Sequence, residues 1–143
     1  MNDEASSGTI EASLYLAWVV ALVATLGSLW FSEVRSFVPC TLCWYQRILM
    51  YPLVLVLGVA AWNRDAGIVR YTLPLTILGA LVAGYHVLDQ KIPGFGVAGA
   101  CRSGVPCDVA YIDWFGFVTI PVLSLTAFLL ISAALVVVAR SHR

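Results

Sequence analysis

Charged side chains are scarce in this sequence. Asp, Glu, Lys and Arg together make up 11% of the 143 residues, whereas soluble domains carry about 25%. Hydrophobic residues make up 61% and the mean hydropathy is +0.91, so a water-soluble fold of this length could not cover its apolar surface with polar groups. The formal net charge is zero, and no segment is a basic run of the kind that binds nucleic acid.

The apolar residues are concentrated in four long runs. Each run has about the 20 residues that a helix needs to cross a bilayer, where helices can satisfy all their own backbone hydrogen bonds. We therefore expect an all-α fold: an integral membrane bundle of four transmembrane helices, forming a single domain over residues 1–143. The expected helices cover residues 12–31, 43–62, 71–88 and 117–139, with connecting loops at 32–42 and 89–113.

The four cysteines lie on one face of the membrane if the chain crosses it four times. Cys40 and Cys43 fall at the start of the second expected helix, and Cys101 and Cys107 fall in the Gly- and Pro-rich link 89–113. The segment before the first run lacks the basic start of a secretory signal, so we expect that run to be retained as a helix. Both termini then share the opposite face.

Lysine and arginine give little guidance on orientation, because four lie on each expected face. Those on the terminal face are Arg64, Arg70, Arg140 and Arg143, and those on the cysteine face are Arg35, Arg47, Lys91 and Arg102. If Arg47 is embedded in the membrane, the terminal face has the excess and is cytoplasmic by the positive-inside rule. Disulfide chemistry also belongs outside the cytosol. We expect a multi-pass protein of the cell membrane with cytoplasmic termini and extracytoplasmic cysteine loops.

The strongest chemical motif is the C-x-x-C formed by Cys40 and Cys43, with Arg47 one helical turn further on. A helix N-terminus and a nearby cation both favour thiolate over thiol, and thiolate is the nucleophile of disulfide exchange. The arginine could also stabilise negative charge on a quinone oxygen during reduction. The alternatives are a structural disulfide, although so short a loop gains little from cross-linking, and a snorkelling interfacial arginine.

The second pair, Cys101 and Cys107, lies in a segment whose glycine and proline permit a tight, exposed loop. An exposed disulfide is the labile kind that a partner thiolate attacks, although a structural clip explains this pair equally well on its own. Two pairs on one face suggest an electron relay. Four cysteines could also bind zinc, but two whole helices separating the pairs is unusual spacing for such a site.

Histidine occurs at two positions, of which one is of interest. His86 ends the third expected helix on the cysteine face, where it could hydrogen-bond a quinone oxygen or transfer a proton. An ordinary interfacial histidine is an equally good interpretation. His142 lies in the terminal tail on the opposite face, and we expect it to be inert.

Three segments together resemble a known family. They read PCTLCWYQRILMYP at 39–52, SGVPC at 103–107 and WFGFVTIP at 114–121. The chain resembles the disulfide bond formation protein B (DsbB) family, and most closely its Gram-positive BdbC-type branch. The resemblance extends over nearly the whole chain, and the short loop between Cys101 and Cys107 departs from the longer loop of proteobacterial members.

The resemblance implies a bacterial membrane enzyme, a thiol–quinone oxidoreductase that generates disulfides. It implies that Cys40 and Cys43 lie beside a quinone (menaquinone or ubiquinone), that Cys43 engages it, and that Arg47 and His86 help to bind it. It further implies that the Cys101 and Cys107 pair takes electrons from a thioredoxin-like partner of the DsbA or BdbD type. The expected partners are therefore that protein, the quinone pool and membrane lipid, with no nucleic acid.

Two other functions compete with this one. A four-helix enzyme similar to a quinone epoxide reductase would run electrons in the opposite direction. A tetraspanning structural or metal-binding protein would hold cysteines that never change redox state. The direction of electron flow separates the first alternative from the oxidase, and the redox state of the cysteines separates the second.

Overall fold

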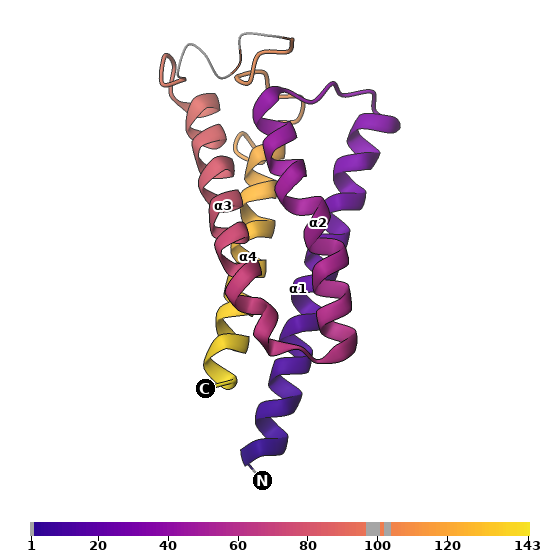
Figure 1. Cartoon of the computed structure of the whole chain (residues 1–143). Helices are drawn as coiled ribbons and strands as arrows, with labels where there is room; N and C mark the ends of the chain where they lie inside the picture. The colour runs from indigo at the N-terminus through magenta and orange to yellow at the C-terminus, as the bar shows by residue number, and fades with distance from the viewer. Residues whose placement is uncertain (1, 97–100, 102–103) are drawn as a thin grey trace.

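The computed structural model describes residues 2–96, 101 and 104–143, so Arg102 and Ser103 lie outside the described part. The described chain forms a bundle of long helices (Figure 1). Their bounds are Asn2–Glu33 for α1, Thr41–Asn63 for α2, Val69–Lys91 for α3 and Ile120–Ser141 for α4, with a short 3-10 helix η1 at Ala66–Ile68. Among the described residues the only bridge of β type joins Trp114 to Val118, which confirms the all-α prediction.

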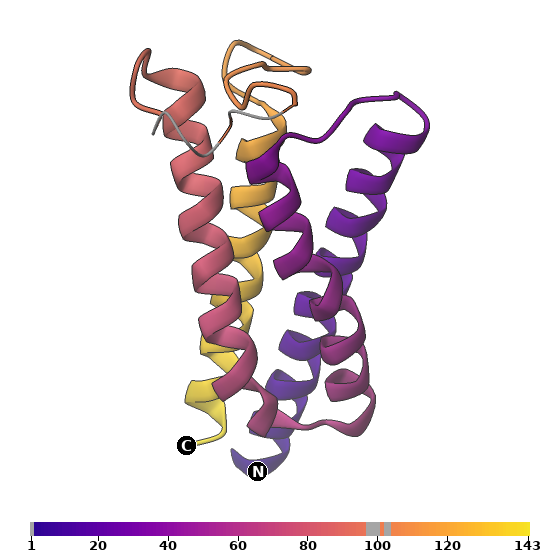
Figure 2. The ribbon, with the colours of Figure 1, turned by 45° about the horizontal axis from the view of Figure 1, so that its top comes forward.

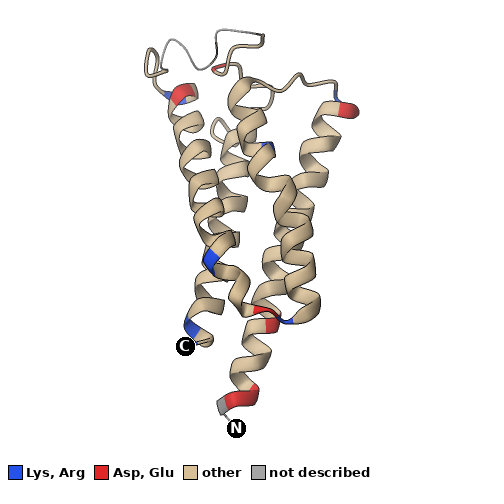
Figure 3. Cartoon of the chain, viewed as in Figure 1, with Lys and Arg blue, Asp and Glu red and all other residues tan. Residues whose placement is uncertain are grey.

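All four long helices are long and apolar enough to cross a membrane. Large apolar side chains point outward in their middle turns, for example Leu55, Val59 and Leu81, which are 74%, 62% and 66% exposed. A bilayer is the solvent that accepts such a surface. Acidic and basic residues gather toward the two ends of the bundle (Figure 3). The chain is a multi-pass membrane protein.

Three of the helices, α1, α2 and α3, extend at both ends beyond the apolar runs from which they were predicted, and α4 starts and ends later than its run. α1 begins at Asn2, ten residues before the expected start at residue 12, because the polar segment ahead of the run contains no proline to stop the helix. α4 begins at Ile120, three residues after the expected start. A turn holds the residues just before it, with Phe115 and Gly116 both at positive φ.

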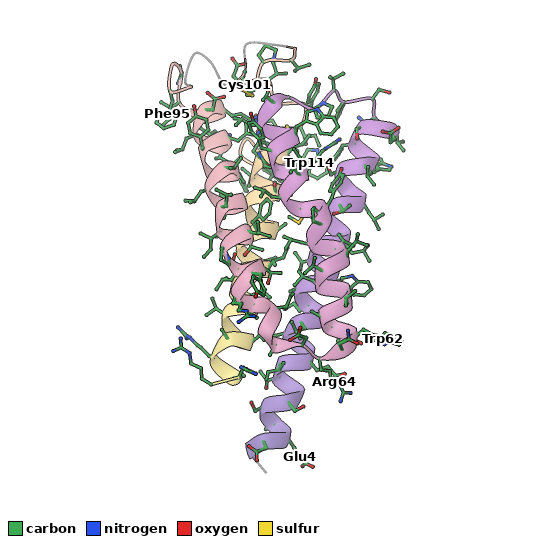
Figure 4. The ribbon with its side chains drawn as sticks, viewed as in Figure 1. Glu4, Trp62, Arg64, Phe95, Cys101 and Trp114 are labelled. Carbon is green, nitrogen blue, oxygen red and sulfur yellow. A yellow bond between two sulfur atoms is a disulfide. The ribbon has the colours of Figure 1, made fainter. Side chains whose placement is uncertain are left out.

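The core of the bundle is packed around α4. Phe128, Ile131 and Leu135 on this helix are fully buried, as are Leu14 on α1 and Leu57 on α2. The links after α1 and after α3 end at the same end of the bundle (Figures 1 and 2). In Figure 4, Cys101, Trp114 and Phe95 lie toward that end, and Trp62, Arg64 and Glu4 toward the other. The predicted common face for the cysteines is therefore present.

Candidate redox site

Cys40 is the N-cap of α2. Its backbone is extended, and its sulfur accepts a hydrogen bond from the backbone N–H of Cys43, at 3.4 Å. Serine, threonine or aspartate normally fills this position with an oxygen acceptor, and here a sulfur satisfies the free N–H. The two side chains are free thiols whose sulfurs lie 2.9 Å apart. The one-turn spacing of the C-x-x-C thus places both sulfurs together at the helix N-terminus.

The surroundings of Cys40 favour its thiolate. The hydrogen bond from the Cys43 side chain contributes most, and bonds from His86 and the Cys43 backbone add to it, so the pKa of Cys40 falls from 9.0 to about 4 despite its burial. The positive end of the α2 dipole acts in the same direction. Because Cys40 Sγ already accepts the backbone N–H, we assign it as the acceptor of the thiol–thiol hydrogen bond and as the site of negative charge.

Arg47 is fixed in place by α1. Its Nη2 donates to the backbone oxygen of Ser28 at 3.0 Å and to Oγ of Ser32 at 2.9 Å. Its guanidinium also lies over the Trp44 ring, 5.4 Å from the ring centroid. These contacts hold a permanent positive charge one turn below Cys43, where the sequence predicted it.

An apolar cavity of about 480 Å³ lies between α1, α2 and α4. Cys43, Gln46 and Arg47 form its polar wall, and most of the remaining lining is aliphatic. Phe37 and Tyr111 also line it and stack with their ring centroids 4.7 Å apart. The cavity therefore offers flat aromatic surface, a thiol and a cation to one occupant.

His86 lies at the junction of the two cysteine pairs. It is 1% exposed, and its Nε2 lies 3.1 Å from the backbone oxygen of Cys107 and 3.6 Å from Cys40 Sγ. Its Nδ1 lies 2.9 Å from Nε2 of Gln46. The described residues that line the cavity include Gln46 but not His86, so the predicted contact of His86 with a quinone stays a prediction.

Cys101 and Cys107 form a disulfide. Cys107 is 2% exposed and packs in one small cluster with Cys40 and Leu42, against which Cys101 also lies. An Asp89 carboxylate oxygen lies within 4.8 Å of both sulfurs of this disulfide. The segment that carries the second pair thus folds onto the N-terminus of α2.

The structure brings five of the six predicted site residues into two adjoining groups. Cys43 and Arg47 face the cavity, while Cys40, His86 and Cys107 meet beside it; Cys101 is joined to Cys107. No three of the four sulfurs form a cluster among the described residues. The four cysteines therefore do not share one centre, although each pair lies within 4.8 Å of one further possible metal ligand, His86 for the first pair and Asp89 for the second.

Sequence reasoning missed Gln46, Asp89 and Tyr111. Gln46 follows Cys43 by three positions, which places both on one helix face, and Asp89 follows His86 by the same spacing. These spacings were available signals. No sequence spacing indicated Tyr111, because its place on the cavity wall depends on how the link after α3 folds back over the bundle.

A free dithiol and a disulfide packed together at one end of a membrane bundle are features expected of a thiol–disulfide oxidoreductase. The chain belongs to the disulfide bond formation protein DsbB family, whose model matches residues 11–138. This agrees with the resemblance found in the sequence.

Several curated relatives are similar over most of their length. The chain is 60% identical to disulfide bond formation protein C of Bacillus subtilis (strain 168) over 118 residues, which cover 82% of this chain and 86% of that protein. It is 50% identical over 131 residues to the probable disulfide formation protein C 1 of Bacillus cereus (strain ATCC 10987), covering 92% and 94%. It is 49% identical over 125 residues to a probable disulfide formation protein of Coxiella burnetii, covering 87% and 85%. No solved structure shows a significant match.

Proposed function

We propose that this protein reoxidises an extracytoplasmic thioredoxin-like dithiol oxidase, of the DsbA or BdbD type, and passes the electrons to a membrane quinone. The observation that supports this most directly is the division of the first cysteine pair. Cys43 lies on the wall of an apolar cavity beside Arg47, and Cys40 faces His86 and the Cys107 segment. This division supports a path in which one sulfur meets a membrane electron acceptor and the other meets the second pair.

The cavity residues fit a quinone, either menaquinone or ubiquinone. A flat apolar head group matches the aliphatic walls and the stacked rings of Phe37 and Tyr111. Arg47 supplies positive charge to a carbonyl oxygen, and Cys43 supplies the thiol. A bound quinone would accept two electrons and two protons. The residues of the chain orient it and exclude water from the reacting sulfur.

The relay runs through the two pairs by thiol exchange. The partner's thiolate attacks Cys101, and its second thiol resolves the mixed disulfide, so the partner is oxidised and Cys101 and Cys107 are reduced. Exchange with the first pair then reforms the Cys101–Cys107 bond and reduces Cys40 and Cys43. Each exchange breaks one S–S bond for every one formed, so both electrons move without a further reactant.

We also propose that the cysteine loops are extracytoplasmic and both termini cytoplasmic, in a bacterial cell membrane. The argument rests on the disulfide, because cytosolic thiols are kept reduced. Labelling a cysteine introduced at Ser141 with a membrane-impermeant reagent in intact cells tests this orientation. We expect no labelling in intact cells and labelling after permeabilisation. Labelling in intact cells would show that the termini are extracytoplasmic and would contradict the proposed orientation.

The deciding experiment mixes the purified protein with a reduced thioredoxin-like oxidoreductase and a soluble quinone, and follows quinone absorbance. We expect quinone loss with the wild type and none with Cys43→Ser or Cys107→Ser. A companion reaction starts from quinol and the oxidised partner, and reduction of the partner there, with no quinone loss in the first reaction, would favour the epoxide-reductase-like direction. Cysteines that alkylation trapping shows unchanged throughout would favour static disulfides.

A further inference from the structure

A buried polar chain connects α2, α3 and the second cysteine pair. Gln46 and His86 are 6% and 1% exposed, and Nε2 of Gln46 lies 2.9 Å from Nδ1 of His86. On the other side of the ring, Nε2 lies 3.1 Å from the Cys107 backbone oxygen and 3.6 Å from Cys40 Sγ. Buried polar groups that are fully paired hold a single arrangement, so the ring orientation is set from both sides.

These contacts determine which ring nitrogen carries the proton. A backbone carbonyl only accepts hydrogen bonds, so Nε2 of His86 must donate to the Cys107 oxygen. A neutral imidazole has one N–H, which leaves Nδ1 as an acceptor. The Gln46 amide nitrogen is then the donor to Nδ1. The N–H of His86 consequently points at the junction where Cys40 and Cys107 meet.

We propose that Gln46 is a positioning residue for disulfide exchange between the two cysteine pairs, because it holds His86 in the tautomer whose N–H faces Cys40. His86 is then a catalytic residue of that exchange, since it contacts a reacting sulfur. This inference rests on the proposed function and assigns His86 to the thiol step. It names a role for Gln46 that the C-x-x-C motif does not contain.

The exchange has two steps, and His86 acts on the second. The Cys107 thiolate attacks Cys40, forming the Cys40–Cys107 bond, and the electron pair of the broken Cys40–Cys43 bond leaves on Cys43. Cys101 then attacks Cys107 as its thiolate, and the electron pair of the Cys40–Cys107 bond leaves on Cys40. The first pair gains the two electrons that the second pair loses. The Nε2–H group of His86 lies 3.1 Å from the Cys107 oxygen and 3.6 Å from Cys40 Sγ, so it is a shared donor that also stabilises the departing Cys40 thiolate through a charge-assisted hydrogen bond.

The described structure has the arrangement that follows this exchange. Cys101 and Cys107 are joined, and Cys40 and Cys43 are free thiols. The lowered pKa of Cys40 agrees with a sulfur that leaves as a stable thiolate. Gln46 also forms part of the cavity wall, so its side chain separates the quinone position from the exchange junction.

The tautomer can be read directly by nitrogen-15 spectra of labelled histidine. The chain has two histidines, and His142→Asn leaves His86 as the single reporter. We expect the Nε2–H form in this background and the Nδ1–H form in Gln46→Glu, whose carboxylate accepts only. Retention of Nε2–H in Gln46→Glu would overturn the proposal. Should that variant not fold, Gln46→Met removes the donor without adding charge and is expected to lose the uniform Nε2–H population.

Kinetics of the exchange give the second readout. Reduced partner is added without quinone, the reaction is quenched in acid, and alkylated Cys40 is followed by mass spectrometry. Because a hydrogen bond to a charged group is lost, we expect Gln46→Glu to slow the appearance of this thiol by about tenfold or more. Ser132→Ala, which removes the 2.9 Å hydrogen bond to Thr76 between α3 and α4, is the matched control and is expected to exchange at the wild-type rate.

A double-mutant comparison separates positioning from simple destabilisation. In a His86→Phe background, Gln46→Glu should cause no additional slowing, because Gln46 acts only through the imidazole. Equal slowing in both backgrounds, or an unchanged rate in the single variant, would overturn the proposal. Failure of the dithiothreitol-reduced wild type to reduce a soluble naphthoquinone would instead overturn the proposed function, and it would leave the tautomer and exchange results as a separate test of Gln46.

Discussion

Arg47 on α2 is bonded to Ser28 on α1, with Nη2 of the arginine 3.0 Å from the serine backbone oxygen. A backbone acceptor fixes the guanidinium regardless of the side chain at residue 28. The bond also joins two of the three helices that line the cavity. The position of the charge therefore depends on the packing of α1 against α2.

Replacing Arg47 with lysine should weaken quinone binding while leaving thiol exchange intact. Lysine keeps the charge but lacks the planar guanidinium group. In Arg47 this group donates to Ser28 and Ser32 while the side chain also lines the cavity. We expect the KM for a soluble quinone to rise by about tenfold, the cost of one charged hydrogen bond. Arg70→Lys, which alters a cation–π contact with Tyr71 outside the site, is the control. A wild-type KM in Arg47→Lys would show that the fork is not needed.

Removing the Tyr111 ring should open the cavity. Its ring stacks on Phe37, and its hydroxyl donates to the backbone oxygen of Val38 at 3.1 Å. An aromatic pair contributes about 0.5–1.5 kcal/mol beyond burial, so Tyr111→Ala should raise the quinone KM several-fold. Tyr111→Phe keeps the stack and should stay close to wild type. If the phenylalanine variant is as impaired as the alanine variant, the hydroxyl rather than the ring closes the cavity.

The reduction potential of the Cys40–Cys43 pair should show a distinct pH dependence. The pKa of Cys40 is lowered from 9.0 to about 4, so the reduced pair is stabilised above pH 4, and this stabilisation is lost as the pH falls through 4. Ionisation removes one of the two protons taken up on reduction. Since each proton contributes about 30 mV per pH unit, the slope should change from about 59 mV to about 30 mV per pH unit as the pH rises past 4. Titration against glutathione in a Cys101→Ser/Cys107→Ser variant measures it.

His86→Phe should move that change of slope to higher pH. The variant removes the hydrogen bond from His86, which helps to lower the pKa of Cys40. If the slope changes at the same pH in the variant, the hydrogen bond from Cys43 alone lowers the pKa of Cys40.

Gly79 should tolerate no larger residue. A Cβ at this position would overlap the ring of Phe128, which is fully buried between α3 and α4. Overpacking of this kind costs about 1–3 kcal/mol, so Gly79→Ala should lower the thermal unfolding midpoint. Gly84→Ala on the same helix meets nothing within 4 Å and should be neutral or stabilising, because alanine favours helix. Equal midpoints for the two variants would contradict the close packing at Gly79.

The membrane class and the number of spans could be predicted because they depend on local properties. Twenty apolar residues in sequence determine whether a segment can cross a bilayer, whatever its neighbours do. The ends of the helices were harder to predict from the sequence, as the start of α1 at Asn2 shows. A polar segment that continues a helix beyond the apolar run leaves no break in the hydrophobic pattern.

The sequence by itself determined that Cys40 and Cys43 lie together and that Arg47 lies one turn further on, since all three lie within two turns of one helix. Only the tertiary structure decided that Gln46, His86 and Cys107 meet beside Cys40. These residues come from α2, from α3 and from the link that follows α3, and no periodicity relates them. Their contact depends on how three separate segments pack, and that is a property of the folded bundle.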